Sequence, residues 1–237
     1  MDLAFAIDTS DSLSQEDFEA QKGAIIMLAK SFGLSRQGTH TSVIIYGSDA
    51  RVAIKLGDHV TIDEFSAAVQ KLSHTGGSTR IDKALLMAST HVFSPENGGR
   101  SGMPKMLIIM TDGQQTSAPD AVPLEEAVAP LRLNGVKVVS VAIGNEVDEY
   151  ELLALSELRD NIFRIQSFDT LYDTVTEVGQ SLCLKASKFV EANCIFYVYI
   201  IRLLWKAICK QFVCLSVCLS GLSNLSSKII KFVKMNL

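Results

Sequence analysis

The sequence predicts an α/β fold: a doubly wound, mostly parallel six-stranded sheet with one antiparallel edge strand and helices on both faces, a Rossmann-like architecture. The first observation behind this prediction is that short apolar segments alternate with segments of helical periodicity over residues 1–183. Such alternation is typical of parallel strands joined by helical crossovers. The second is the close succession of segments 41–46 and 51–56. So short a connection predicts a hairpin, and therefore an antiparallel edge strand.

Six segments have the composition of strands. Segment 106–110 is a continuous apolar run, as in strands that are covered by helices on both faces. Segment 51–56 alternates apolar and polar residues, which is typical of a half-buried strand. The predicted strands are residues 3–7, 41–46, 51–56, 106–110, 136–143 and 162–165.

Six other segments have the periodicity of helices. In residues 16–32, apolar side chains such as Phe18 and Ile25 fall on one helical face. Pro130 is expected to kink or shorten the fourth helix, and Gly135 predicts where that helix ends. The predicted helices are residues 16–32, 62–72, 81–93, 124–133, 149–158 and 171–182.

The composition excludes several classes of protein. The chain has 237 residues, 22 Lys and Arg against 26 Asp and Glu, a net charge of −4 and 48% hydrophobic residues. These values exclude a disordered chain, a collagen repeat and a basic nucleic-acid-binding domain, so no nucleic-acid partner is expected. The charge is unevenly distributed, with a net −11 over residues 1–183 and a net +7 over residues 184–237. We therefore expect one domain over residues 1–183 and a separate basic tail that contains four of the five cysteines.

The tail, residues 184–237, has two apolar stretches. The stretch at 194–201 stops at Arg202, and the stretch at 211–227 is rich in serine. A membrane span needs about 20 mostly apolar residues, so none is predicted here. The basic amphipathic end at 228–234 would provide only weak attraction to an acidic membrane surface. We interpret the tail as a poorly structured extension or as translated non-coding sequence.

Polar side chains follow two central strands of the predicted sheet, at the point where each strand ends. One group comes directly after the first strand, a single carboxylate follows the fourth, and a threonine ends a Gly-Gly-Ser-Thr turn before a helix. In doubly wound sheets the ligand site lies at the carboxyl ends of the strands, near the point where the strand order reverses. The sequence therefore predicts that these side chains converge on one crevice. They are Asp8, Ser10, Ser12, Thr79 and Asp112.

These candidate ligands are carboxylate and hydroxyl oxygens, with no Cys or His among them. Hard oxygen donors suit Mg²⁺, Mn²⁺ or Ca²⁺ better than Zn²⁺ or copper. Two carboxylates supply at most two negative charges, so an ion held partly through water keeps residual positive charge and an exchangeable position. A Glu or Asp of a partner protein is expected to fill that position. In the alternative reading, Asp8 and Ser12 only cap the helix that begins near Ser14, and Asp112 and Gly113 form an ordinary turn.

The motifs resemble the von Willebrand factor type A domain, also called the integrin I-domain-like fold. The resemblance covers about residues 1–183, and it is carried by DTSDS at 8–12, by the turn that ends at Thr79 before RIDKAL, and by MTDG at 110–113. It is strongest to the extracellular-matrix A domains of matrilins and collagen-associated chains.

This resemblance implies a metal-ion-dependent adhesion site. In that family the matching residues hold Mg²⁺ or Mn²⁺ weakly, with Ser10, Ser12 and Thr79 as direct ligands and with Asp8 and Asp112 as the remaining members of the site. The family also implies adhesion to collagen, other matrix proteins or other A domains, and secretion.

Four features depart from the family pattern. Family members usually pair a cysteine before the first strand with one after the last helix; Cys183 stands at the second place, and nothing precedes Met1 to pair with it. No secretory signal is visible, because strand-like sequence begins at Leu3, so we expect either an intracellular chain or a sequence that starts downstream of its true start. Asp11, in the middle of the first motif, either adds charge near the ion or faces solvent. The tail matches nothing in the family.

Two rival functions share the predicted fold. A Mg²⁺-dependent phosphoryl transferase would use Asp8 as its nucleophile, but it would need a second acid at the position of Ser10. An intracellular A domain could act as a scaffold for complex assembly. We favour a non-enzymatic adhesion module.

His74 is the histidine nearest to the predicted site, and we interpret it as a surface residue.

Overall fold

The six predicted strands form a single sheet, in the order β3-β2-β1-β4-β5-β6. The structure, a computed structural model, describes residues 1–145, 147–171, 175 and 179. All neighbouring strands are parallel except β2 and β3, which form the predicted antiparallel hairpin at one edge. The strands are β1 (Asp2–Asp8), β2 (His40–Tyr46), β3 (Ala50–Ile54), β4 (Lys105–Thr111), β5 (Val136–Ile143) and β6 (Ile162–Ile165).

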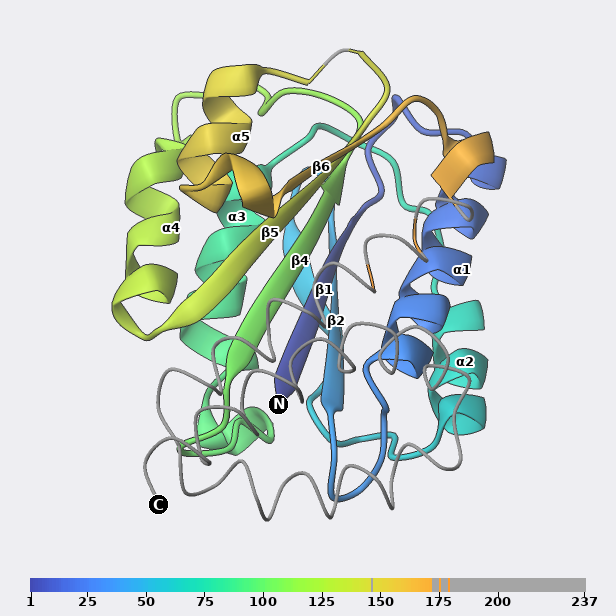
Figure 1. The fold of residues 1–237 in the computed structure, drawn as a ribbon. Coiled ribbons are helices and arrows are strands. Elements are labelled where there is room, and N and C mark those ends of the chain that lie inside the picture. The colour runs from blue at the N-terminus through green and yellow to red at the C-terminus, as the bar shows by residue number, and fades with distance from the viewer. Residues whose placement is uncertain (146, 172–174, 176–178, 180–237) are drawn as a thin grey trace, which may run out of the picture. The chain divides into compact units, whose positions relative to one another are not determined.

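Helices cover both faces of the sheet. Helices α1 and α2 lie on one face, and α3, α4 and α5 lie on the other (Figure 1). All five follow predicted segments, and their ends differ from the predicted ends by no more than a few residues, except in α3. The helices are α1 (Gln15–Ser31), α2 (Ile62–Gln70), α3 (Ile81–Met87), α4 (Leu124–Leu133) and α5 (Glu149–Ser156).

The α3 segment corrects one prediction. The sequence predicts a continuous helix over 81–93, but the α-helix ends at Met87 and a single π-helical turn, Ala88–Val92, follows. Two hydroxyls bond to the same carbonyl oxygen here: Ser89 Oγ and Thr90 Oγ1 donate to Leu86 O at 3.0 and 2.6 Å. Hydroxyl side chains that bond to the preceding turn compete with the regular backbone ladder.

Helix α4 has its predicted bounds, Leu124–Leu133, and Pro130 lies inside it without shortening it.

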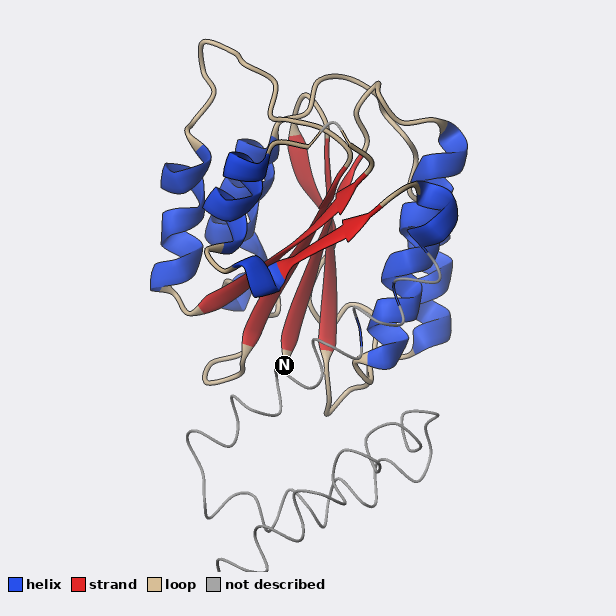
Figure 2. Ribbon diagram, turned by 45° about the horizontal axis from the view of Figure 1, so that its top comes forward, coloured by secondary structure: helices blue, strands red, loops and turns tan. Residues whose placement is uncertain are grey.

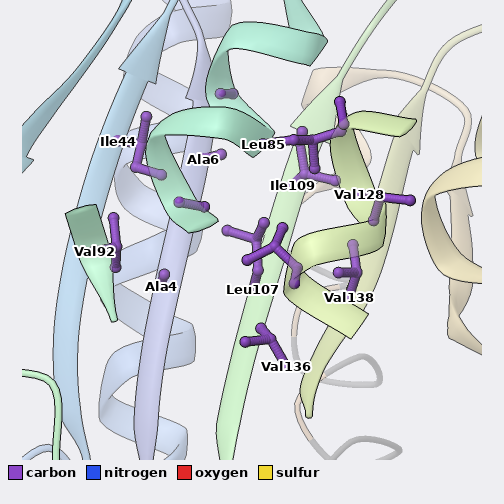
Figure 3. Close-up of a cluster of buried hydrophobic side chains, with 14 of the residues drawn as sticks. Ala4, Ala6, Ile44, Leu85, Val92, Leu107, Ile109, Val128, Val136 and Val138 are labelled. Carbon is purple, nitrogen blue, oxygen red and sulfur yellow. The ribbon is translucent and has the colours of Figure 1, made fainter. Parts of the chain in front are cut away.

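The core lies on both sides of the sheet and is divided by the alternation of side chains along the strands. On the face covered by α3 and α4, Ala4 and Ala6 of β1 lie beside Leu107 and Ile109 of β4 (Figure 3). On the other face, Phe5 packs with its ring 6.5 Å from that of Phe65 in α2. Burial on both sides explains why the central strands are continuous apolar runs.

The topology brings the ends of β1 and β4 together. The chain leaves β1 towards β2 on one side and enters β4 on the other, so the strand order reverses between these two neighbours. Their carboxyl ends and the connecting loops lie at the same edge of the sheet (Figure 2).

The predicted last helix, 171–182, lies largely outside the described residues. The tail, Cys183 and the predicted boundary after residue 183 lie wholly outside them. Within the described part, no helix is long and apolar enough to cross a membrane.

Candidate metal centre

Asp8, the last residue of β1, is completely buried, and its backbone is fixed from two directions. The side chain of Gln21 in α1 accepts from Asp8 N at 3.1 Å and donates to Asp8 O at 3.0 Å. The carboxylate is held as well: Oδ1 accepts from the amide of Ser10 at 2.8 Å. These bonds therefore fix the backbone at the end of β1, and the amide of Ser10 holds the Asp8 carboxylate against the turn that follows.

Two hydroxyls connect this turn to the end of β4. Ser10 Oγ and Ser12 Oγ lie 3.0 Å apart, and Ser12 Oγ donates to Asp112 Oδ1 at 3.1 Å. Thr111, one residue earlier, places Oγ1 3.5 Å from Asp8 Oδ2. Four of the five predicted residues, Asp8, Ser10, Ser12 and Asp112, therefore form one continuous polar cluster at the point where the strand order reverses.

Thr79 reaches this cluster through its neighbours in the chain. Its segment is bonded to the β1 turn twice: Thr75 Oγ1 lies 2.8 Å from Thr9 Oγ1, and Gly77 O accepts from the amide of Asp11 at 2.8 Å. Thr79 itself is nearly buried, with 8% of its surface exposed. The segment that carries Thr79 is therefore packed directly against the loop that carries Ser10 and Ser12.

The close approach of these two segments requires glycine. Gly76 and Gly77 have φ angles of +73° and +103°. A Cβ atom at Gly76 would lie 2.4 Å from Asp11 Oδ1, and one at Gly77 would lie 2.3 Å from Ser48 Oγ. Only residues without a side chain fit both the space and the backbone conformation. Asp11 is exposed to solvent, and its carboxylate lies over Gly76.

The electrostatics of the cluster suit a cation. Burial raises the pKa of the Asp8 carboxyl to about 6; hydrogen bonds from Ser10 oppose the rise, and the nearby Asp112 carboxylate adds to it. Among the ion pairs of the described residues, none involves Asp8. A buried carboxylate beside a second carboxylate is destabilised unless positive charge is supplied. The hard oxygens of this cluster therefore fit a divalent cation.

The site has few acidic groups. Nowhere in the described part of the chain do three or more His, Cys, Asp or Glu side chains gather closely enough to hold a metal. Any ion at this cluster would depend on hydroxyl oxygens in addition to its two carboxylates.

The alternative reading of Asp8 and Ser12 as helix caps is wrong. The N-cap of α1 is Ser14, whose side chain accepts from the amide of Asp17 at 3.1 Å. Asp17 in turn accepts from the amide of Ser14 at 3.1 Å, which completes a capping box. The helix start is satisfied without Asp8 or Ser12, so their side chains are available for another role.

Some residues of the cluster were missed or misread in the sequence. His74 is half-buried, not a surface residue: its Nε2 lies 3.0 Å from Ser10 O, and its ring centroid lies 5.6 Å from that of Phe18. Gln21 was overlooked, although its spacing of three and four residues from Phe18 and Ile25 places a polar side chain on the apolar face of its helix. Thr111 lies inside the quoted motif at 110–113 but was not predicted as a site residue; it extends β4 by one residue beyond the predicted strand.

A shallow hollow adjoins the cluster. It has a volume of about 370 Å³ and lies between the β1 turn, the start of α1 and the segments that follow β5 and β6. The residues that line it include Ser12, Asp112, Asn145, Gln166 and Phe168. The candidate metal centre is thus open to a group that approaches from outside the fold.

Comparison with known proteins agrees with the fold and the motifs. The von Willebrand factor type A domain family matches residues 2–177. The chain is 29% identical over 192 residues to von Willebrand factor A domain-containing protein 2 of Xenopus laevis. This alignment covers 81% of this chain and 23% of that protein. It is 30% identical over 185 residues to the human collagen alpha-6(VI) chain, and 27% identical over 186 residues to chicken matrilin-1. These two alignments cover 77% and 78% of this chain, but only 8% and 37% of the relatives, which are much longer.

A solved structure has the same fold. Proximal thread matrix protein 1 from the mussel byssus, whose structure was solved with a zinc-occupied MIDAS motif, superimposes with a TM-score of 0.71 at 23% identity. The alignment covers 77% of this chain and 48% of that one. At this identity the likeness supports the fold alone. The match over residues 2–177, together with the sheet order and the cluster at the ends of β1 and β4, shows that this chain belongs to the von Willebrand factor type A domain family.

Proposed function

We propose that this chain is a divalent-cation-dependent adhesion module that binds a protein partner. Ser10, Ser12 and Thr79 would hold the ion directly, and Asp8 and Asp112 would hold its water ligands and balance its charge. The bound ion, Mg²⁺ or Mn²⁺ and less favourably Ca²⁺, would supply a Lewis-acidic position for an outside oxygen. We assign this function to residues 1–183 and none of it to the tail.

One observation carries the proposal: the continuous contact from Asp8 through Ser10 and Ser12 to Asp112. These contacts hold oxygens from two different strand ends in one place. A preorganised set of hard donors loses little conformational entropy on binding. Because only two of the donors are charged, a carboxylate from a partner would complete the neutralisation of a divalent ion.

The partner is proposed to be a protein of the extracellular matrix, with collagen as one candidate. The relatives that support this setting include a collagen VI chain, a matrilin and vitrin. Extracellular localisation is proposed on the same ground. The hollow beside Asp112 offers room for the residues that flank the partner's carboxylate.

A catalytic role for Asp8 is less well supported. A nucleophilic carboxylate must reach its substrate, but Asp8 is completely buried and its Oδ1 is held by the amide of Ser10. We propose that the module has no enzymatic activity. A phosphatase screen with generic substrates tests this directly, because Mg²⁺-dependent turnover that is abolished by Asp8→Asn would establish the enzyme instead.

The adhesion function is tested by measuring metal and ligand binding in parallel. Calorimetry with MnCl₂ and MgCl₂ measures the affinity of the chain for each ion. Binding of the chain to immobilised collagen and to other immobilised matrix proteins, in Mn²⁺ and in EDTA, measures adhesion. Thr79→Ala and Asp112→Ala should abolish both activities. Thr39→Ala and Asp63→Ala are the matched controls, because Thr39 precedes β2 at the opposite edge of the sheet and Asp63 is exposed in α2. Adhesion that survives EDTA and both site variants would remove the ion from the mechanism.

A further inference from the structure

The loop between β4 and α4, residues 112–123, closes back onto the segment that carries Thr79. Arg80, which follows Thr79 in the chain, bonds to both segments. Within its own segment, its Nε and one terminal nitrogen donate to the two carboxylate oxygens of Asp82 at 2.9 and 2.8 Å. The same guanidinium donates to Asp120 Oδ1 at 2.9 Å and to Asp120 O at 3.1 Å. Arg80 is 5% exposed and Asp82 is fully buried, so water hardly competes for the Arg80–Asp82 bonds, whereas the Asp120 side chain is 68% exposed.

Gln115 adds a second connection between the two segments. Helix α3 receives no side-chain cap from Arg80, the residue at its N-cap position. Instead, Gln115 Oε1 accepts from the amide of Asp82 at 2.7 Å, and Gln115 Nε2 donates to Val122 O at 3.0 Å. The loop thus satisfies an amide that the helix start leaves open.

The third connection reaches Thr79 itself. Thr116 Oγ1 accepts from the amide of Thr79 at 3.0 Å, and the amide of Thr116 donates to Thr79 O at 2.8 Å. Both backbone polar groups of Thr79 are therefore bonded to one residue. Since the loop begins at Asp112, whose Oδ1 accepts from Ser12, it ties together the two segments that bear Thr79 and Asp112.

We propose that the 112–123 loop is a brace that sets the position of Thr79 for metal binding, with Thr116 as its positioning residue. Thr116 touches no ion in this scheme; it acts by fixing the backbone of Thr79. The brace would keep the Thr79 hydroxyl at a constant distance from the Ser10, Ser12 and Asp112 oxygens. This inference rests on the proposed metal site.

Thr116→Val in the full chain tests the brace, because it removes the acceptor for the Thr79 amide and keeps the shape of the side chain. Thr116 is exposed, so the variant is expected to fold. The loss of one ordinary hydrogen bond corresponds to a change of about fivefold in an equilibrium, so Mn²⁺ measured by calorimetry should bind about fivefold more weakly. In EDTA, exchange of the Thr79 amide measured by NMR should become about fivefold faster for the same reason.

Two further variants separate positioning from general destabilisation. Thr116→Ser keeps the hydroxyl and should stay within about twofold of the wild type in both measurements. Thr39→Val removes another threonine hydroxyl, which donates to Phe32 O at 2.6 Å at the opposite edge of the sheet, and it should leave Mn²⁺ affinity and Thr79 exchange unchanged.

The inference is overturned if Thr116→Val binds Mn²⁺ as tightly as the wild type, or if the Thr79 amide stays protected in that variant. A wild-type chain that binds no Mn²⁺ would overturn the proposed function, and the metal-positioning role of the brace with it. The exchange measurement in EDTA then still reports whether Thr116 holds Thr79.

Discussion

At the scale of single residues, the Arg80–Asp82 pair is the most consequential contact outside the candidate metal site. Both side chains are withdrawn from solvent, and every bond of the guanidinium goes to Asp82 or Asp120. A buried ion pair of this kind contributes little more than a well-packed apolar pair would, but removal of one partner leaves an uncompensated charge. The pair also binds the 112–123 loop, because Arg80 donates to Asp120 and Asp82 accepts from the amide of Val122.

The first prediction concerns this pair. Arg80→Met should lower the free energy of unfolding by about 3–5 kcal/mol, because the Asp82 carboxylate stays buried without its guanidinium partner. Arg80→Met combined with Asp82→Asn should recover part of the loss, since the amide is neutral and still accepts from Val122. Denaturant unfolding of the three chains measures the difference. Equal stability of the single and the double variant would show that the buried charge is not the cause.

The first prediction extends to the pH dependence of stability, which the same pair controls. Burial alone would raise the pKa of Asp82, but the hydrogen bonds from Arg80 and from the Val122 amide outweigh it and hold that pKa below its usual range. A carboxyl with a depressed folded-state pKa stabilises the fold above its unfolded pKa, about 3.9, and the stabilisation is lost as the pH falls through the folded value. Between pH 5 and pH 3, unfolding free energy should therefore fall more steeply in the wild type than in Asp82→Asn.

Gly77 gives the second prediction. Gly77→Ala should cost about 1–3 kcal/mol, because an L-residue is strained at a φ of +103° and the new Cβ meets Ser48. Gly33→Ala is the matched control: its φ is also positive, at +68°, but nothing lies within 4 Å of the added Cβ. Thermal unfolding of both variants should show a larger loss at Gly77. Equal losses would mean that the backbone angle alone matters and that the contact with Ser48 is relieved.

At the scale of elements, two helices begin with the same device at different places in the fold. Ser14 with Asp17 starts α1 directly after the turn that follows β1, and Thr61 with Glu64 starts α2 after the loop that follows β3. Each capping box satisfies two amides that the helix cannot bond internally. Only the first of them also fixes the end of the loop that carries Ser10 and Ser12.

The third prediction uses this pair of caps. Ser14→Ala and Thr61→Ala should each lower stability by about 1 kcal/mol, which is typical for loss of a helix cap. Only Ser14→Ala should also weaken Mn²⁺ binding, because it loosens the end of the turn between β1 and α1. Calorimetry on both variants checks this. Weaker Mn²⁺ binding in Thr61→Ala by the same factor would indicate a general effect of stability on affinity.

The elements show where prediction from sequence works and where it fails. The apolar runs of β1, β4 and β5 predict those strands to within one residue at each end, because burial on two faces makes most of their residues apolar. The end of α3 could not be predicted, because Ser89 and Thr90 are ordinary helix residues until their hydroxyls bond to Leu86 O. Local competition of this kind leaves no periodic signal.

At the scale of the whole molecule, the reversal of strand order between β1 and β4 locates the candidate site. Short motifs at two strand ends were enough to predict Asp8, Ser10, Ser12 and Asp112 as neighbours, since parallel strands align their carboxyl ends. The brace could not be predicted in this way. Thr116 lies 37 residues from Thr79 in a loop without helical or strand-like periodicity, and only the folded chain brings the two together.

The last prediction couples the site to the stability of the whole domain. An ion that binds only the folded chain stabilises it by RT ln(1 + [L]/Kd), so Mn²⁺ at 100 times its dissociation constant should add about 2.7 kcal/mol. For a domain of this size that corresponds to a rise in Tm of roughly 5–10 °C. Scanning calorimetry of the wild type in increasing MnCl₂ should show a logarithmic increase, and EDTA should reverse it.

Asp112→Ala is the decisive comparison for this experiment. The Asp112 side chain belongs to the candidate site and is partly exposed, so its removal should abolish the Mn²⁺-dependent rise in Tm without unfolding the chain. Asp63→Ala, which removes an exposed carboxylate from α2, should leave the rise intact. If Asp112→Ala were stabilised by Mn²⁺ as much as the wild type, the ion would bind elsewhere, and the cluster at the ends of β1 and β4 would need another ligand to offset its two neighbouring carboxylates.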